Sequence, residues 1–332
     1  MIQVQNLSKS FRVHTKEPGL KGSVKALFKR DWKEKAALKG VSLQVQAGEI
    51  LGLVGANGAG KTTLVKMLSG IIHPTSGTAT VLGHVPWERD NAFRHQIALI
   101  MGQKAQLWWD LPAADCFLLL QEIYRIPQTR FDETLEYLTE TLSVRDQLKI
   151  QIRRLSLGER MKMELIAALL HSPKVVFLDE PTIGLDLTAQ RAIRDFLLKY
   201  RRENQPAMIL TSHYMEDIER LCERIVIIRD GQFVYDGSLD RVVREYARHK
   251  IIIARLGEGA AGGAAEPGAA LPEGLGEMVS RSSEELRIKV PRERVPEAAS
   301  EILKRLPVLD LEIEEEDIGT VIEALMSKGP RA

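Results

Sequence analysis

A glycine-rich turn between an apolar run and a helical pattern carries the clearest chemistry in this sequence. It reads ILGLVGANGAGKTTLVKMLSG over residues 50–70 and fits the phosphate-binding pattern G-x-x-x-x-G-K-[ST] at every position. Glycines let the backbone approach an oxyanion closely, and N–H groups at a helix start solvate phosphate oxygens. Lys61 would reach the terminal phosphates and the Thr62 hydroxyl would bind Mg²⁺. The residues expected to bind phosphate are Gly55, Asn57, Gly58, Ala59, Gly60, Lys61, Thr62 and Thr63.

Two carboxylates end a second apolar run, Val175–Glu180, which reads VVFLDE. If this run is a buried strand beside the phosphate loop, Asp179 would hold Mg²⁺ directly or through water. Glu180 would then polarise the attacking water.

Three further side chains are candidates whose ordinary interpretation stays open. Gln103 follows the apolar run at 97–100, and its amide oxygen could contact Mg²⁺ or the attacking water, although a Gln at a strand end is usually just polar. His213 follows the apolar run Met208–Leu210 and could contact the γ-phosphate, although a lone His there is more often structural. Phe11 could stack on adenine or could be an ordinary core or edge aromatic.

The turn Leu155–Glu159, which reads LSLGE, opens a helix expected over Arg160–Leu170. Ser156 is a good N-cap residue and Gly158 leaves room for the backbone, so the turn could hold an anion. A cap with no ligand is the alternative.

The whole chain limits the class of protein. Its 332 residues suffice for one large α/β domain and a smaller second one. A net charge of +1 gives no polyelectrolyte character, so no nucleic-acid partner is expected. The cysteines, Cys116 and Cys222, stand alone in apolar segments, which favours a reducing cytosol. The start lacks the apolar core of a signal peptide, and no apolar run approaches the roughly 18 residues of a membrane-spanning helix.

A basic insertion over residues 14–35 is the strongest local charge feature. Ile2–Leu7 before it alternates as a strand does, and a turn is expected at Ser8–Ser10. Within the insertion, apolar residues at helical spacing alternate with lysines, which predicts an amphipathic helix with a cationic face. Such a face suits lipid headgroups or a membrane partner, and equally a solvated surface. The apolar positions are Val24, Leu27, Phe28 and Trp32.

Alternating strand and helix patterns predict a mainly parallel sheet covered by helices, with the phosphate loop after an inner strand. Residues 113–152 read as helices with a break at Pro127. Before them, the adjacent Trp108 and Trp109 cannot both face one core, so one ring is expected on the surface as an anchor for a partner.

The character of the sequence changes near residue 247. Residues 257–276 are rich in Gly, Ala and Pro and predict a flexible loop within a small α+β domain. Its strands are expected at Ile251–Arg255, Leu286–Val290 and Val308–Ile313, and its helices at Val295–Leu306 and Gly319–Leu325.

Taken in order, these pieces resemble the ATPase subunit of an ABC transporter over about residues 1–237. The matching motifs are Walker A at Gly55–Thr62, the Q-loop at Gln103, the signature at Leu155–Glu159, Walker B at Val175–Glu180, the D-loop through Asp186 and the H-loop at His213. The resemblance implies an α/β fold of the P-loop NTPase type with a helical subdomain at about 104–165. The nucleotide-binding domain would span 1–240 and the C-terminal domain 241–332.

The resemblance also implies an enzyme that hydrolyses ATP with Mg²⁺. Phe11 would stack on adenine, Glu180 would be the catalytic base with Gln103 and His213 beside it, and Asp186 would join the nucleotide-binding residues. Mg²⁺ would be held by Thr62, Gln103 and Asp179.

The family forms head-to-tail dimers, in which Ser156 and Gly158 of one copy close on the ATP held by Lys61 of the other. The signature reads LSLGE where LSGGQ is commonest, so Leu157 and Glu159 replace a glycine and a glutamine. Ser156 and Gly158 are kept, and an active site is expected.

A finer resemblance is to exporters of the ABC-2 type, which implies a peripheral position on the cytoplasmic face of the cell membrane. The insertion looks like the gate helix of polysaccharide exporter ATPases. The run GQKAQLWWDLP over residues 102–112, with the C-terminal domain, looks more like drug or viologen exporter ATPases, which we favour. Gln103–Pro112 would border the groove for a permease's coupling helix. A glycan exporter ATPase, a soluble ABC ATPase and an import ATPase remain the alternatives.

Overall fold

The computed structural model describes residues 1–14, 32–102, 104–257 and 276–328. It divides into two compact units, residues 1–237 and 238–332. The sequence analysis places the corresponding boundary between residues 240 and 241. All motifs of the expected site lie in the first unit.

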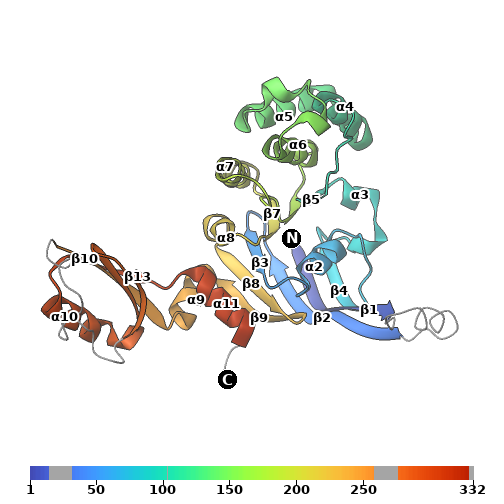
Figure 1. Ribbon diagram of the computed structural model, residues 1–332. Helices are drawn as coiled ribbons and strands as arrows, with labels where there is room; N and C mark the ends of the chain where they lie inside the picture. The colour runs from blue at the N-terminus through green and yellow to red at the C-terminus, as the bar shows by residue number, and fades with distance from the viewer. Residues whose placement is uncertain (15–31, 103, 258–275, 329–332) are drawn as a thin grey trace, which may run out of the picture. The chain divides into compact units, whose positions relative to one another are not determined.

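A six-stranded sheet with the order β5-β6-β7-β3-β8-β9 forms the centre of the first unit (Figure 1). Its strands β5, β6, β7, β3 and β8 pair in parallel, and β3 and β7 are buried along their whole length. Continuous apolar runs suit such strands because helices cover both faces of a parallel sheet. The bounds are β3 Ile50–Val54, β5 Ile97–Met101, β6 Val175–Asp179, β7 Ala207–Thr211, β8 Arg224–Arg229 and β9 Gln232–Ser238.

A three-stranded sheet, β2-β1-β4, packs its apolar side chains into the same core. It comprises β1 Ile2–His14, β2 Trp32–Val45 and β4 Ser76–Val81. The turn expected at Ser8–Ser10 is wrong, because β1 continues through it with register shifts against β2 and β4. Pairing with two neighbours overrides the local turn signal there, and bulges absorb the irregularity.

The amphipathic helix predicted from the insertion is only partly testable. Residues 15–31 lie outside the described residues. At Trp32, the last apolar position of the predicted helix, the prediction is wrong, because Trp32 lies in β2 and pairs with His14.

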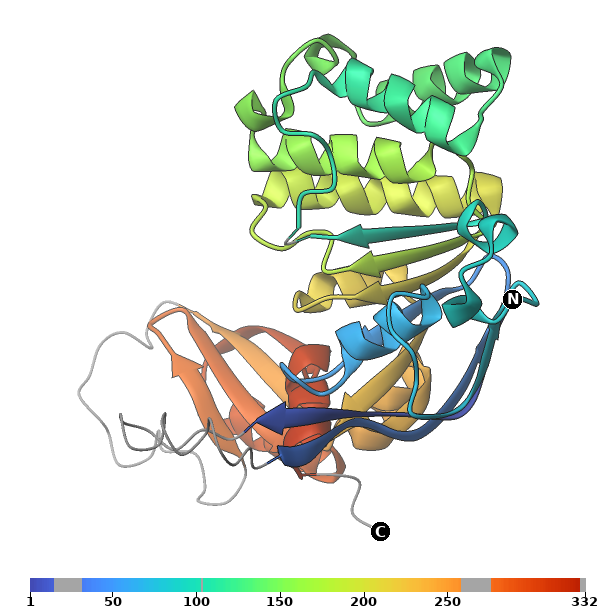
Figure 2. The same cartoon turned by 90° about the vertical axis from the view of Figure 1, so that its right-hand side faces the viewer.

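Helices α4, α5 and α6 gather beyond the β5 edge of the central sheet (Figures 1 and 2) and form the expected helical subdomain. The predicted break at Pro127 separates α4 from α5. Short 3-10 turns lie at Pro86–Glu88, Arg145–Gln147 and Ile152–Arg154. The helix bounds are α2 Lys61–Leu68, α3 Asn91–Arg94, α4 Ala113–Tyr124, α5 Gln128–Thr141, α6 Leu157–Leu169, α7 Leu187–Asn204 and α8 Met215–Leu221.

The second unit contains an antiparallel sheet with the order β11-β12-β10-β13, and α10 packs on it around Ile252, Ile288 and Ile302. The expected strands and helices are all present, and β11 was not expected. A 3-10 turn lies at Arg292–Arg294. The bounds are α9 Leu239–Tyr246, β10 His249–Leu256, β11 Glu277–Arg281, β12 Glu285–Pro291, α10 Val295–Arg305, β13 Val308–Glu315 and α11 Ile318–Lys328.

Candidate functional site

The phosphate loop connects β3 to α2, and two of its glycines lie where a side chain does not fit. A Cβ on Gly55 would lie 2.4 Å from the carbonyl oxygen of Ile228, and Gly60 has a φ of 119° in the left-handed region. Gly60 is the N-cap of α2 and supplies no side-chain acceptor. Within the described residues no N-cap side chain takes the first N–H groups of α2, which can therefore bind an outside acceptor. Asn57 and Gly58 form the exposed tip of the loop.

The turn between β8 and β9 holds the loop from behind. The backbone N–H of Gly231 donates to the carbonyl of Ala59 at 3.2 Å, and the N–H of Lys39 donates to the carbonyl of Gly231 at 2.8 Å. The Gly231 turn thus supports the loop and is itself held by β2.

The β1–β2 ribbon brings Phe11 towards the same loop. Phe11 pairs with Lys35, and the carbonyl of Ala37 further along β2 would lie 2.6 Å from a Cβ on Gly60. The Phe11 ring is 39% exposed, and the ammonium of Lys9 lies 5.2 Å from its centroid. A partly exposed ring beside a phosphate loop can accept a base by stacking.

Lys61 is buried at the start of α2, with 5% of its surface exposed. Its ammonium donates to the carbonyl oxygens of Gly55 at 2.6 Å and Ala56 at 3.3 Å. Burial lowers the pKa of Lys61, and the nearby carboxylates of Glu180 and Asp179 partly offset this effect. A phosphate anion would stabilise the charged form of this ammonium.

Three oxygen-bearing side chains meet at the ends of β6 and β7. The hydroxyl of Thr62 donates to Asp179 Oδ1 at 3.2 Å, and the hydroxyl of Thr211 donates to the same oxygen at 2.7 Å. Hydroxyl and carboxylate oxygens are the ligands that Mg²⁺ prefers. Among the described residues no group of three His, Cys, Asp or Glu side chains could hold a metal. Thr63 lies half-buried beside Thr62.

Glu180 follows Asp179 and contacts the His213 imidazole, with 2.7 Å between Oε1 and Nε2. The carboxylate is 14% exposed and the imidazole is 37% exposed. Glu180 has a φ of 58°, and its N–H donates to the Thr211 carbonyl at 3.0 Å and to the Thr211 hydroxyl at 3.2 Å. The strand end therefore turns sharply and presents the carboxylate to His213.

Gly102 packs directly on this turn. Its N–H donates to the Asp179 carbonyl at 2.9 Å, and a Cβ on it would lie 1.9 Å from the Glu180 carbonyl oxygen. Gln103 comes next in the chain and lies outside the described residues. Its predicted contacts remain predictions.

Ser156 caps α6 as expected, through a capping box with Glu159. The N–H of Glu159 donates to the Ser156 hydroxyl at 3.3 Å, and the Ser156 N–H and hydroxyl donate to Glu159 Oε2 at 2.9 and 2.8 Å. These hydrogen bonds from the Ser156 backbone and side chain lower the pKa of Glu159. Ser156, which is expected to bind a phosphate, therefore already donates hydrogen bonds to a carboxylate of its own chain.

The start of α7 lies against this signature turn. Asp186 caps α7 by accepting the N–H of Ala189 at 2.8 Å. A Cβ on Gly158 would lie 2.9 Å from the Ala189 Cβ, and one on Gly184 would lie 3.4 Å from a Leu157 methyl group. The signature and the D-loop thus form one surface of the chain.

The parallel register explains why the first set of predicted residues converges. Asp179 pairs with Met101 on one side and with Thr211 on the other, and Thr211 pairs with Leu53 just before the phosphate loop. Sequence reasoning missed Thr211, whose position next to Asp179 follows only from the strand order. The predicted residues that gather at the carboxyl ends of these parallel strands are Gly55–Thr63, Asp179, Glu180 and His213.

Comparison with known proteins decides the family. Residues 38–183 match the family model described as ABC transporter, and residues 248–314 match that of an EvrA-like ABC transporter, C-terminal domain. The ABC transporter ATP-binding protein NatA of Bacillus subtilis (strain 168) is 30% identical over 204 residues, which cover 61% of this chain and 82% of NatA. The chain belongs to the ABC transporter ATP-binding proteins. It is an ATP-binding, ATP-hydrolysing subunit of this family, as the sequence predicts.

One further relative and one solved structure are similar to this chain over about the same length. The Nod factor export ATP-binding protein I of Rhizobium sp. (strain N33) is 30% identical over 224 residues, covering 68% of this chain and 73% of that protein. The dimeric structure of the ATP-binding cassette MJ0796, in a post-hydrolysis state bound to ADP and Pi, has a TM-score of 0.59 at 21% identity. It covers 72% of this chain and 98% of the cassette. The predicted P-loop ABC ATPase fold is confirmed.

Proposed function

We propose that this chain drives substrate export of the ABC-2 type through a separate membrane permease, using ATP hydrolysis between two copies of itself. The proposal rests on one observation above all: the Lys61 loop, the Thr62–Asp179 pair and the Glu180–His213 pair converge at one sheet edge. Export is supported by the relative named as a Nod factor export protein.

The binding half of the site follows from charge and donor groups. The α2 N–H groups and the Lys61 ammonium bind phosphate oxygens, and Phe11 stacks on the base. Thr62 and Asp179 hold Mg²⁺, with Gln103 as a further oxygen ligand. When bound there, Mg²⁺ would supply positive charge opposite the phosphate oxygens.

The hydrolytic half of the site follows from the contact between Glu180 and His213. Glu180 is the general base that accepts a proton from water, and its 14% exposure keeps it largely out of bulk solvent. His213 orients the Glu180 carboxylate through the 2.7 Å contact.

We propose that Ser156 and Gly158 of a second copy complete each site, with Asp186 alongside. Ser156 is exposed at the start of α6, so a partner copy can reach it, and its hydroxyl would exchange the bond to Glu159 for one to phosphate. The dimeric MJ0796 cassette supports this arrangement.

Glu159→Gln is expected to strengthen the ATP-dependent dimer about threefold to tenfold. The ionised carboxylate 2.8 Å from the Ser156 hydroxyl repels a phosphate that approaches the same hydroxyl, and the amide removes this repulsion. Light scattering of the Glu180→Gln chain with and without this change measures the dimer dissociation constant. Weaker dimerisation would show that Glu159 aids closure instead.

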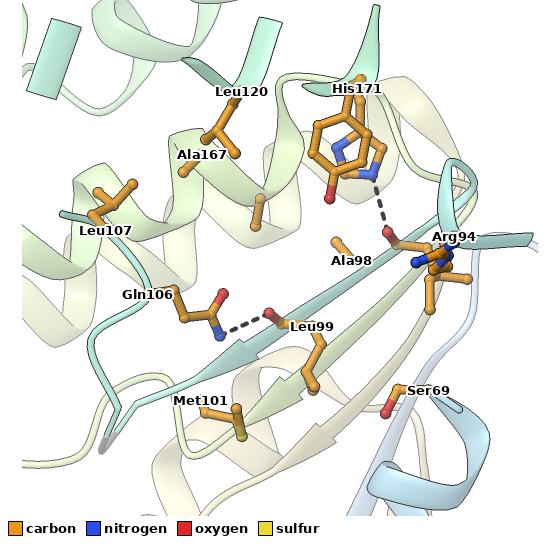
Figure 3. A pocket seen from close by; sticks show the side chains of 13 residues that line it. Ser69, Arg94, Ala98, Leu99, Met101, Gln106, Leu107, Leu120, Ala167 and His171 are labelled. Carbon is orange, nitrogen blue, oxygen red and sulfur yellow. Dashed lines mark hydrogen bonds between the residues drawn. The ribbon is translucent and has the colours of Figure 1, made fainter. Parts of the chain in front are cut away.

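A cavity of about 380 Å³ between β5, α4 and α6 is our candidate for the permease's docking helix. Leu99, Leu107 and Leu120 line it with other apolar side chains (Figure 3). His171 stacks on Tyr124 with 4.0 Å between ring centroids, and its Nε2 hydrogen-bonds the Ile97 carbonyl at 2.9 Å. Burial lowers the pKa of His171 to about 4, so this wall of the cavity is neutral.

The segment after Gln103 borders this cavity and is tied to the signature helix. Glu164 on α6 accepts the backbone N–H groups of Gln106 at 2.8 Å and Leu107 at 3.2 Å. Trp108 and Trp109 are 43% and 50% exposed, so both rings, and not only one, lie at the surface. A partner seated here would therefore contact a segment fastened to the helix that begins at Ser156.

Ile123→Glu is expected to weaken assembly with the permease at least about tenfold. Ile123 and Leu119 are 58% and 43% exposed and lie one turn apart on α4, next to Leu120 and Tyr124, which line the cavity. Leu118→Glu is the matched control, because Leu118 is 50% exposed but lies on another side of α4. Pull-down of the co-expressed permease compares the two. Equal effects would remove this groove from the interface.

Localisation provides the test of the whole proposal. In the part of the chain that the structure describes, no helix is long and apolar enough to cross a bilayer. From its family we expect the chain to reach the cell membrane through its permease, on the cytoplasmic face. Co-expression with the permease should move it to the membrane fraction and give ATP-dependent export in vesicles, whereas co-purification with ribosomes would contradict the proposal.

A further inference from the structure

A buried ion pair between Arg194 and Asp217 lies in the first unit, shielded from water. Arg194 on α7 and Asp217 on α8 are 2% and 0% exposed, and Nε of the guanidinium lies 2.6 Å from Oδ1 of the carboxylate. Burying two charges is costly unless further hydrogen bonds satisfy them. The other hydrogen bonds of Asp217 and Arg194 therefore indicate which segments the pair keeps in place.

The second carboxylate oxygen of Asp217 binds two segments of the proposed hydrolytic site. The hydroxyl of Ser212 donates to Oδ2 at 2.6 Å, and the hydroxyl of Thr182 donates to the same atom. Ser212 directly precedes His213, and Thr182 follows Glu180 by two residues. One buried oxygen thus anchors both chain segments that carry the Glu180–His213 pair.

The guanidinium of Arg194 extends the network to the D-loop. It donates to Gln190 Oε1 at 2.9 Å, and the Gln190 amide donates to the carbonyl of Leu185 at 3.0 Å. Leu185 precedes Asp186, the N-cap of α7. Gln190 itself is 5% exposed, so each link of this chain of bonds is shielded from water.

We propose that Asp217 is a positioning residue that holds Glu180, His213 and the D-loop in one fixed arrangement. The inference rests on the proposed function and adds to it a group that touches none of the reacting atoms. The two hydroxyls are neutral and both donate to Oδ2, so their removal perturbs the arrangement without leaving Asp217 and Arg194 unpaired.

Thr182→Val and Ser212→Ala are the decisive variants. Each is expected to lower kcat for ATP hydrolysis about tenfold and to leave the KM for ATP within about twofold, because the phosphate loop is untouched. In the nucleotide-free chain, the NMR signals of the His213 ring should also shift, identified by their absence in His213→Gln. Thr182→Ser, which restores the hydroxyl, should recover kcat.

Glu216→Gln is the matched control. Glu216 contacts the same guanidinium at 2.6 Å, but it is 46% exposed and has no contact with Thr182 or Ser212 in the described chain. Its kcat and His213 signals should stay at wild-type values. Asp217→Asn should exceed both hydroxyl variants in effect, and if it does not fold, the hydroxyl variants still decide.

The results of these experiments distinguish failure of the positioning role from failure of the proposed function. Unchanged kcat and unchanged His213 signals in Thr182→Val and Ser212→Ala, with wild-type turnover present, overturn the positioning role alone. A wild-type chain with no ATP turnover in its assembled complex overturns the proposed function and this inference together.

Discussion

Glu180→Gln is expected to lower kcat for ATP hydrolysis at least about 100-fold while ATP still binds. The amide keeps the size of the side chain and its place beside His213, but it cannot accept a proton from water. Because the bound nucleotide then persists, a stable dimer should form when ATP is added. Steady-state hydrolysis and size-exclusion chromatography with light scattering measure the two effects.

The control for this change is Glu223→Gln, which removes a carboxylate that is 84% exposed and paired with Arg201 at the surface. It should hydrolyse ATP like the wild type. Wild-type turnover by the Glu180 variant would remove Glu180 from the role of base.

Lys61→Met is expected to weaken ATP binding about 100-fold without lowering the stability of the nucleotide-free chain. The lowered pKa of Lys61 means that folding disfavours its charged form, since two backbone carbonyls do not replace full hydration. This destabilisation is present at neutral pH and disappears as the pH rises through the lowered pKa towards the ordinary value of 10.5. Methionine removes it at every pH.

Nucleotide titration and thermal unfolding without nucleotide test the two halves of this prediction. Lys66→Met is the matched control, because Lys66 lies half-buried in the last turn of the same helix. It should leave ATP affinity unchanged. A marked loss of stability in the Lys61 variant would show that its ammonium stabilises the empty loop.

The residues that the sequence identified best are those whose chemistry is local. The phosphate loop needs a strand, a glycine turn and a helix start in immediate succession, and Gly55–Thr62 shows all three in order. Ser156 was recognised as an N-cap because capping depends on residues only three positions apart. Parallel strand ends share one edge, which is why Asp179 and His213 could be assigned to the loop's neighbourhood.

Features that depend on distant pairing could not be predicted. β1 runs on through Ser8–Ser10 because β2 and β4 pair with it, although the local residues favour a turn. β11 is exposed at every position, so its sequence shows no alternation to recognise. The Arg194–Asp217 pair joins residues 23 apart in two helices, and neither helix pattern reveals it.

The turn at Gly231 has a mechanical implication for the C-terminal unit. That unit begins where β9 ends, at Ser238, and β9 starts at Gln232, right after the glycine whose N–H binds the Ala59 carbonyl. The strand β9 thus joins the C-terminal unit covalently to the residue that supports the phosphate loop.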